Sequence, residues 1–492
     1  MQSVDLTALG AADLSERIHA REVSCREVMA AFLDRVDERN AELNAIVSRR
    51  DRDELLAEAA ACDEEIVHDL SRGWMHGLPQ AIKDLAETRG LRTTSGSPLL
   101  ADFVPDFDAL VVSRMKADGC IVIGKTNVPE FGLGSHTFNP VFGATRNPYD
   151  TDRSAGGSSG GAAVALATRM LPVADGSDYM GSLRNPAAWN HVFGFRPSQG
   201  RVPSHPARDH YLAQLGTEGP MGRSVLDVAM LLGTQAGWDR RDPLSLSGDL
   251  DEFATVAHAR ATLETSATID GLEGLRIGWL GDLDGYLAME SGIIDVCTAG
   301  LARLAHLGCT IEPARFAMSP GEVWDAWLVW RHFLVSAGLG PLAADPARRT
   351  KVKPEALWEI ERGVALTGAD IARAGAARSS FHTAMVSLFS RFDALAIPTA
   401  QVWPFPVEER WPQRICDREM DTYHRWMEVT AYATFAGLPA ISVPVGFDGR
   451  GLPMGMQLIG PPRADVDLLR LAHTYEQTLG DFAVGARAIG AA

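Results

Sequence analysis

Apolar residues recur along this chain at spacings that predict several helices. Ser24 and Glu27 form a capping box, and apolar residues follow at helical spacing from Val28 to Val36. Comparable patterns predict further helices over residues 53–61, 108–116 and 466–479, and a run of small residues predicts a tightly packed helix over 160–168.

Short apolar runs predict buried strands between these helices. The runs cover residues 78–85, 120–123, 171–174, 275–280, 393–397 and 440–445. Pro444 cannot donate a ladder hydrogen bond, so the last run is expected at a sheet edge or a strand end. Because strands and helices alternate nearly throughout, we expect an α/β layered fold with a central mixed β-sheet flanked by helices.

The chain of 492 residues is long enough for a large buried core, and we expect a single domain over residues 1–492. Residues 240–430 are less regular than the rest and hold eight of the eleven tryptophans. We expect this region to cover the substrate pocket as a lid or a wall.

The formal net charge of −17 gives the protein an acidic surface. Such a surface repels phosphate backbones and anionic lipids, so we expect a small-molecule substrate and neither nucleic acid nor membrane as partner. The six cysteines lack C-x-x-C spacing, and no secretion signal or apolar run of ~18 residues is apparent. These features predict a cytoplasmic protein, for which a homodimer is compatible with the sequence. The histidines show no H-E-x-x-H pattern, so we expect no metal and no cofactor.

Three segments concentrate residues that could carry chemistry. Residues 154–161 place four glycines around Ser158 and Ser159 before an alanine-rich helix, which favours a rigid loop over a flexible linker. Residues 176–186 form a turn around Ser182 after an apolar run. Lys83 lies within a mostly apolar run, where an ammonium is costly unless it is paired or neutral, so Lys83 is a candidate general base.

Together these segments resemble the amidase signature family. The resemblance rests on GGSSGG, on a following GSD-x-x-GS-x-R block and on an upstream IKD lysine. Residues 124–131, 143–148, 437–444 and 451–460 are similar to further blocks of that family. The resemblance covers nearly the whole chain and is weakest over residues 240–390.

The resemblance implies a role for each of these residues. Ser182 would be the nucleophile, Ser158 a bridging serine after a cis Gly157–Ser158 peptide bond, and Lys83 the base. Backbone N–H groups at Tyr179, Met180, Gly181 and Ser182 would form an oxyanion hole. Residues expected to support the site are Gly157, Ser159, Ser177, Asp178 and Arg184, the last two as a bidentate pair.

The predicted function is hydrolysis of a carboxylic amide through an acyl-enzyme. Neutral Lys83 would draw the proton of Ser182 through Ser158, which requires a lysine pKa of about 10.4 to fall to about 7, within the reach of burial. Tyr179 and Met180 depart from the Thr/Leu/Ile-Gly-Gly-Ser pattern of the family, and Met180 is expected to add bulk beside the nucleophile.

Other interpretations stay open at this level. The chain could be the amidase subunit of a tRNA-dependent glutamine amidotransferase complex, or a binding protein without activity. Residues 119–126 match the P-loop pattern of NTPases, although β-branched residues between the glycines favour a strand. Residues 156–160 match the G-x-S-x-G elbow of α/β-hydrolase esterases, with His424 or His473 as base, although no strand is predicted directly before them.

Aromatic residues of the variable region are candidates for the pocket. Trp324, Trp327 and Trp330 share roughly one helical face, for which core packing is the ordinary explanation. The predicted pocket residues are Phe131, Trp324, Trp327, Trp403 and Trp426. They favour aryl or bulky apolar amides, with carbamates, hydrazides and esters as alternatives.

Overall fold

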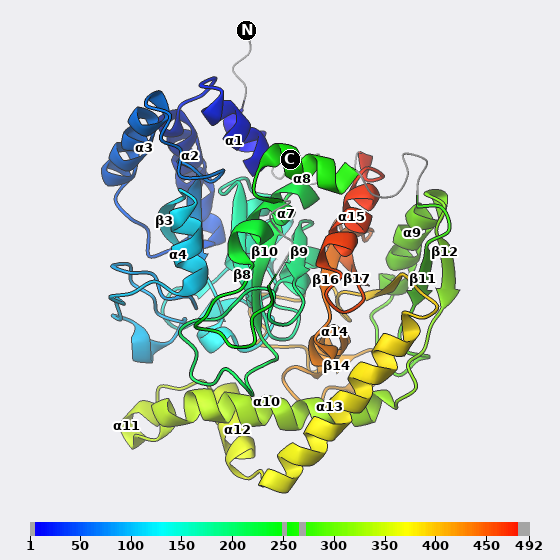
Figure 1. Ribbon diagram of the computed structural model, residues 1–492. Helices are drawn as coiled ribbons and strands as arrows, with labels where there is room; N and C mark the ends of the chain where they lie inside the picture. The colour runs from blue at the N-terminus through cyan, green and yellow to red at the C-terminus, as the bar shows by residue number, and fades with distance from the viewer. Residues whose placement is uncertain (1–4, 248–252, 265–271, 481–492) are drawn as a thin grey trace.

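An eight-stranded mixed sheet forms the centre of the molecule in the computed structural model, which describes residues 5–247, 253–264 and 272–480 (Figure 1). In spatial order its strands are β12 (Thr310–Pro313), β11 (Arg276–Trp279), β13 (Ala394–Pro398), β17 (Pro453–Ile459), β16 (Ala440–Phe447), β9 (Phe193–Arg196), β10 (Thr217–Gly222) and β8 (Val173–Asp178). β12, β11 and β13 are parallel, and every pairing from β13 to β8 is antiparallel. The predicted central mixed sheet is confirmed.

A three-stranded sheet lies against β8 and carries the candidate lysine. Its strands, in spatial order, are β1 (Ile46–Val47), β3 (Ile121–Thr126) and β2 (Pro79–Lys83). Asp175 of β8 joins the two sheets, because its carboxylate accepts the backbone N–H of Lys83 at 3.1 Å and the side-chain amide of Gln80 at 3.2 Å. Three two-stranded sheets complete the set: β4 (Phe138–Asn139) with β5 (Gly143–Ala144), β6 (Arg146–Asn147) with β7 (Asp150–Ser154), and β14 (Arg414–Ile415) with β15 (Arg418–Glu419).

Helices flank these sheets. Those that precede β9 in the chain are α1 (Ala11–His19), α2 (Cys25–Leu43), α3 (Arg52–Val67), α4 (Leu110–Ala117), α5 (Gly160–Ala167) and α6 (Arg184–Trp189). The later ones are α7 (Val225–Gln235), α8 (Val256–Glu264), α9 (Ile293–His306), α10 (Pro320–Ala343), α11 (Pro346–Arg349), α12 (Pro354–Val364), α13 (Gly368–Leu388), α14 (Ala431–Ala436) and α15 (Asp465–Glu476). Short 3-10 turns occur at η1 (Leu6–Ala8), η2 (Pro98–Leu100), η3 (Glu130–Gly132) and η5 (Arg425–Thr430).

Local sequence explains where several of these elements begin and end. The predicted capping box is present at the start of α2, where Ser24 Oγ accepts the Glu27 N–H at 3.1 Å and the Glu27 carboxylate accepts the Ser24 N–H at 2.9 Å.

Pro444 lies in an internal strand, but β9 pairs only with Ala440–Ser442, and a register shift follows Pro444. The proline therefore lies beyond the part of β16 that needs donors on both sides.

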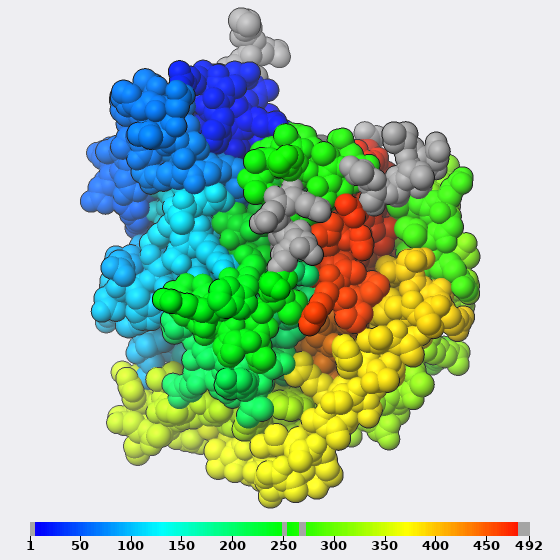
Figure 2. Space-filling view, in the orientation of Figure 1, coloured from blue at the N-terminus to red at the C-terminus, as the bar shows by residue number. Residues whose placement is uncertain are grey.

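Residues 240–430 are more regular than the sequence indicated. They include α10, which is 24 residues long, and α13, which is 21 residues long. These helices form a layer at the lower end of Figure 1, opposite α1–α3, and Figure 2 shows the same separation on the surface. Within the described ranges, no helix has both the length and the apolar character needed to cross a membrane.

Candidate active site

Lys83 ends β2 with its amine enclosed by serine oxygens. Its Nζ lies 2.9 Å from Ser158 Oγ, 2.7 Å from Ser159 Oγ, and 2.9 and 3.2 Å from the Oγ and backbone oxygen of Ser177. The residue is 1% exposed. In the part of the chain that the structure describes, no carboxylate lies within ion-pair distance of this amine. The amine is therefore bound by hydroxyl groups instead of being neutralised by a partner.

Burial changes the protonation of this amine. Desolvation lowers the pKa of Lys83 to about 8, and the carboxylates of Glu218, Asp175 and Asp178 act in the opposite direction. A neutral amine has two N–H donors and one lone pair, so at least one neighbouring hydroxyl can donate to it. This arrangement lets Lys83 accept a proton from a serine.

Close packing explains the glycine-rich segment that carries Ser158. A Cβ on Gly161 would lie 2.4 Å from the backbone nitrogen of Asn127, the residue after β3. The start of α5 therefore packs so close to the end of β3 that only glycine fits at position 161. The Gly157–Ser158 peptide bond is cis, as predicted. Ser135 Oγ donates to the Gly157 carbonyl and Thr137 Oγ1 to the Gly156 carbonyl, each at 2.7 Å. These hydrogen bonds fix the glycine-rich segment to residues 135–137.

Asp178 and Arg184 hold the turn that carries Ser182. The Arg184 guanidinium donates two hydrogen bonds of 2.9 Å to the Asp178 carboxylate, which confirms the predicted bidentate pair. Burial alone would raise the pKa of Asp178, but Arg184 and Arg196 hold it below its usual range. Arg184 also donates to the Thr430 carbonyl and to Thr434 Oγ1, each at 3.0 Å, which anchors the turn to α14.

Ser182 lies next to the bridging segment. The Ser159 N–H donates to the Ser182 carbonyl at 3.2 Å, so the two serine-bearing segments are joined one residue from Ser158. Ser182 is 7% exposed. Gly181 has a φ of +81°, and a Cβ there would lie 2.6 Å from Thr430, so only glycine fits before this serine.

The structure differs from the predicted oxyanion hole at Gly181. The Gly181 N–H donates to Asp178 Oδ1 at 2.8 Å, so it braces the turn. Among the described residues, the N–H groups of Tyr179, Met180 and Ser182 meet no acceptor, so they stay candidates for the predicted oxyanion hole. The Met180 side chain is 2% exposed and packs in the hydrophobic core.

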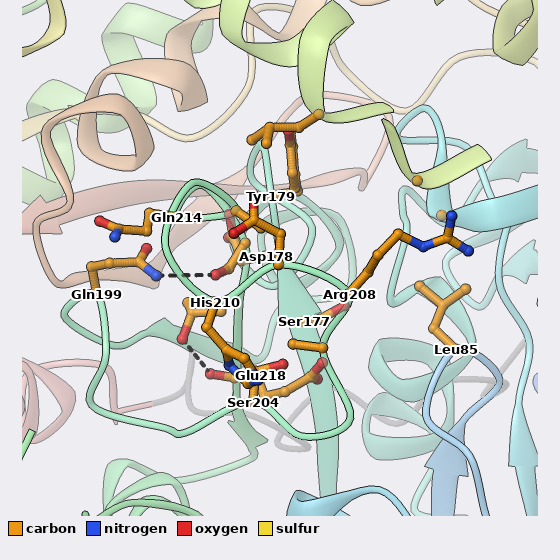
Figure 3. Close-up of a pocket in the computed structure, with 18 of the residues that line it drawn as sticks. Leu85, Ser177, Asp178, Tyr179, Gln199, Ser204, Arg208, His210, Gln214 and Glu218 are labelled. Atoms are coloured by element: carbon orange, nitrogen blue, oxygen red, sulfur yellow. Dashed lines mark hydrogen bonds between the residues drawn. The ribbon is translucent and has the colours of Figure 1, made fainter. Parts of the chain in front are cut away.

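A cavity of about 700 Å³ opens beside Ser158 and Ser177, and we call it the relay cavity. Leu85, Phe131, Leu133, Leu334 and Val335 form much of its apolar wall, and Tyr179, Glu218 and Arg331 are among its polar residues. Figure 3 shows Tyr179, Ser177 and Glu218 bordering the same space, together with Gln199, Ser204, His210 and Gln214 from the segment between β9 and β10. Ser182 is not among its lining residues.

Of the predicted aromatic pocket residues, Phe131 alone lines this cavity. Trp324 and Trp327 are buried and stack on each other with ring centroids 5.0 Å apart, and Trp426 stacks on Trp189 at 5.7 Å. Trp403 is 4% exposed and its Nε1 donates to the Ser291 carbonyl. These four tryptophans are core residues, so their prediction as pocket residues is wrong. For Trp324 and Trp327, helical spacing indicates a shared helix face but does not show whether that face meets a pocket or the core.

The rival motifs lack the context that they require. Residues 121–126 form strand β3, so the P-loop pattern contains no phosphate-binding loop. The strand before Ser158 is β7, which belongs to a two-stranded sheet instead of the central sheet of a nucleophile elbow. Cys62, Glu65 and His76 bring three potential metal ligands together, but both His76 nitrogens are within hydrogen-bond distance of backbone groups.

Several residues of the site had no sequence signal. Asp175, Ser135 and Thr137 reach the site only through sheet pairing and loop packing. Glu218 pairs across the β8–β10 ladder with Ser177, which the sequence could not show because the pairing joins residues 41 positions apart. α10 contributes Arg331 from more distant sequence still.

Comparisons with known proteins show which family and which relatives this chain resembles. A family model described as Amidase matches residues 27–469. Among curated proteins, a glutamyl-tRNA(Gln) amidotransferase subunit of Thermus thermophilus is 37% identical over 488 residues, covering 94% of this chain and 96% of that protein. The corresponding subunit of Thermosynechococcus vestitus is 33% identical over 489 residues, covering 95% and 97%.

Solved structures give a second comparison. A bacterial aryl acylamidase of the amidase signature family superposes with a TM-score of 0.87 at 30% identity, covering 97% of this chain and 98% of that one. A glutamyl-tRNA(Gln) amidotransferase subunit from Thermotoga maritima superposes with a TM-score of 0.71 at 27% identity, covering 97% and 96%.

Proposed function

This chain belongs to the amidase (amidase signature) family, and from that premise we propose that it cleaves a carboxylic amide through an acyl-enzyme on Ser182. The observation that carries the proposal is the buried Lys83 amine, 2.9 Å from Ser158 Oγ and without an ion-pair partner among the described residues. The hydroxyls of Ser158 and Ser182 are weak nucleophiles, so a serine mechanism needs a base that removes a proton, and a neutral Lys83 amine would supply it.

The proposed reaction moves one proton along the relay in each direction. Ser158 passes its proton to Lys83 and takes the proton of Ser182, whose oxygen then bonds to the amide carbon. The N–H groups of Tyr179, Met180 and Ser182 stabilise the oxyanion. The C–N bond breaks as Ser158 donates its proton to the departing nitrogen, and Lys83 returns the first proton to Ser158. Water then attacks the acyl-enzyme by the same route and releases the acid.

The relay cavity supports an aryl or bulky apolar amide as substrate. Its walls include Phe131, Leu85 and Leu133, together with Leu334 and Val335 of α10. Such a surface stabilises apolar groups through burial. The superposition on an aryl acylamidase supports the same class.

A second candidate is the amidase subunit of a tRNA-dependent glutamine amidotransferase. The 37% and 33% identity to two glutamyl-tRNA(Gln) amidotransferase subunits favours it, and on sequence it has more direct support than the stand-alone hydrolase. The apolar cavity and the higher TM-score with the aryl acylamidase favour the hydrolase.

The two candidates predict different substrates for the purified chain. We expect the chain alone to hydrolyse aryl anilides faster than glutamine, because the apolar walls bury an aryl group. Release of arylamine and of ammonia should be measured with and without amidotransferase partner subunits. Release of ammonia from glutamine that depends on those subunits, without anilide turnover, would establish the second candidate instead.

A further inference from the structure

Glu218 places a carboxylate in the relay cavity, next to the proposed catalytic machinery. It lies directly opposite Ser177 in the β8–β10 ladder, so the two side chains share one face of the sheet. Ser177 Oγ in turn lies 2.9 Å from Lys83 Nζ. Figure 3 shows Glu218 beside Ser177 at the border of the cavity.

The other carboxylates of the cavity already have partners. Asp178 is paired with Arg184, Asp242 accepts the Ser204 N–H at 2.9 Å, and Asp209 accepts the Tyr211 N–H at 2.8 Å. The Glu218 carboxylate, by contrast, is half-buried and has no hydrogen-bond donor or ion pair among the described residues. Of the cavity's three arginines, Arg331 is bound to Glu359 and Tyr423, and Arg208 and Arg463 are exposed.

A half-buried carboxylate without a protein partner, at the border of a largely apolar cavity, is open to a ligand that supplies a hydrogen-bond donor. Burial raises the pKa of Glu218, and the charge of Lys83 acts against that rise. A bound ammonium group would supply the missing hydrogen bonds and a compensating charge.

We propose that Glu218 is a specificity-determining residue that binds a cationic amino group of the substrate, so that the preferred substrates are apolar amides bearing an amine. This inference rests on the proposed function. The apolar walls bury the body of such a substrate, and the carboxylate recognises its ammonium group.

The same contact favours the active form of Lys83. Three carboxylates act to keep Lys83 protonated: Glu218 from β10, and Asp175 and Asp178 from β8. Asp178 is neutralised by Arg184, and Asp175 accepts two hydrogen bonds, from Lys83 N–H and Gln80. A substrate cation beside Glu218 offsets the remaining charge, so binding of the correct substrate lowers the pKa of the lysine and promotes the base.

Matched substrates test this proposal. The wild-type protein and Glu218→Gln are compared on two pairs of acyl anilides, in which an aminomethyl group or its ethyl isostere is placed on the acyl half or on the arylamine half. We expect wild type to prefer the amine-bearing member of at least one pair in kcat/KM. Glu218→Gln should reduce that preference at least about tenfold, the loss expected for a hydrogen bond to a charged group, and Glu218→Asp should retain part of it.

The outcomes separate this inference from the proposed function. If wild type shows no preference in either pair, or if Glu218→Gln keeps the preference, the inference is overturned. Ser182→Ala must abolish turnover of both members, and turnover that survives this change overturns the proposed function as well. Binding of benzylamine to the intact protein, measured by calorimetry, gives an independent check: wild type should bind it more tightly than Glu218→Gln, and equal affinities contradict the proposal.

Discussion

Lys83 differs from a surface lysine in every group that surrounds its amine. The amine is buried, and its close contacts are with Ser158, Ser159 and Ser177 instead of with water or a carboxylate. The two sheets create this environment, because β2 ends beside β8 and Asp175 holds them together. Burial therefore lets Lys83 lose its proton at a lower pH than a solvated lysine does.

The pH dependence of activity follows from that burial. Desolvation lowers the pKa of Lys83 to about 8, so the amine is protonated and inactive below that pH and becomes neutral as pH rises through it. We expect kcat/KM to rise about tenfold per pH unit up to about pH 8 and to level off above that pH. A pH–rate profile measures this. Burial lowers the pKa of His424 to about 4, so a plateau that extends down to pH 5 would instead fit a histidine base.

At the scale of elements, α10 forms one wall of the relay cavity, and a buried polar network joins α10 to α12. Glu359 of α12 accepts hydrogen bonds from Arg331 of α10 and, at 2.7 Å, from Tyr423, and it also pairs with His332. The Arg331 guanidinium lies 5.4 Å from the centroid of the Tyr179 ring, beside the nucleophile turn. The network therefore extends from α12 through Arg331 to the Tyr179 ring, which precedes the turn that carries Ser182.

Breaking this buried network should destabilise the protein far more than breaking an exposed ion pair of the same helix, α12. Glu359→Gln removes the anion that compensates buried Arg331, and we expect the free energy of unfolding to fall by about 3–5 kcal/mol. Glu361→Gln removes an exposed pair with Arg349 and should cost less than about 1 kcal/mol. Urea unfolding of both variants measures the difference. Equal losses would show that α10 and α12 are held by apolar packing alone.

At the scale of the whole molecule, the features that could be predicted from the sequence are those that depend on neighbouring residues in the chain. The run 78–85, the glycine-rich segment and the turn around Ser182 gave the order of strand, loop and turn, and the resemblance to the amidase signature family supplied the cis Gly157–Ser158 bond. Contacts between distant segments were not encoded in this way. The pairing of Glu218 with Ser177 depends on strand register, and the burial of Trp324 and Trp327 depends on what their helix packs against.

The most direct test of the account is acylation of the protein by a serine-reactive probe, followed by mass spectrometry. We predict a single label on Ser182, and labelling at least about 100-fold slower in Lys83→Met, because the base that activates the serine is lost. Lys351→Met, which removes an exposed lysine, should be labelled at the wild-type rate. A label on another residue, or an unchanged rate in Lys83→Met, would contradict the claim that buried Lys83 activates Ser182 through Ser158.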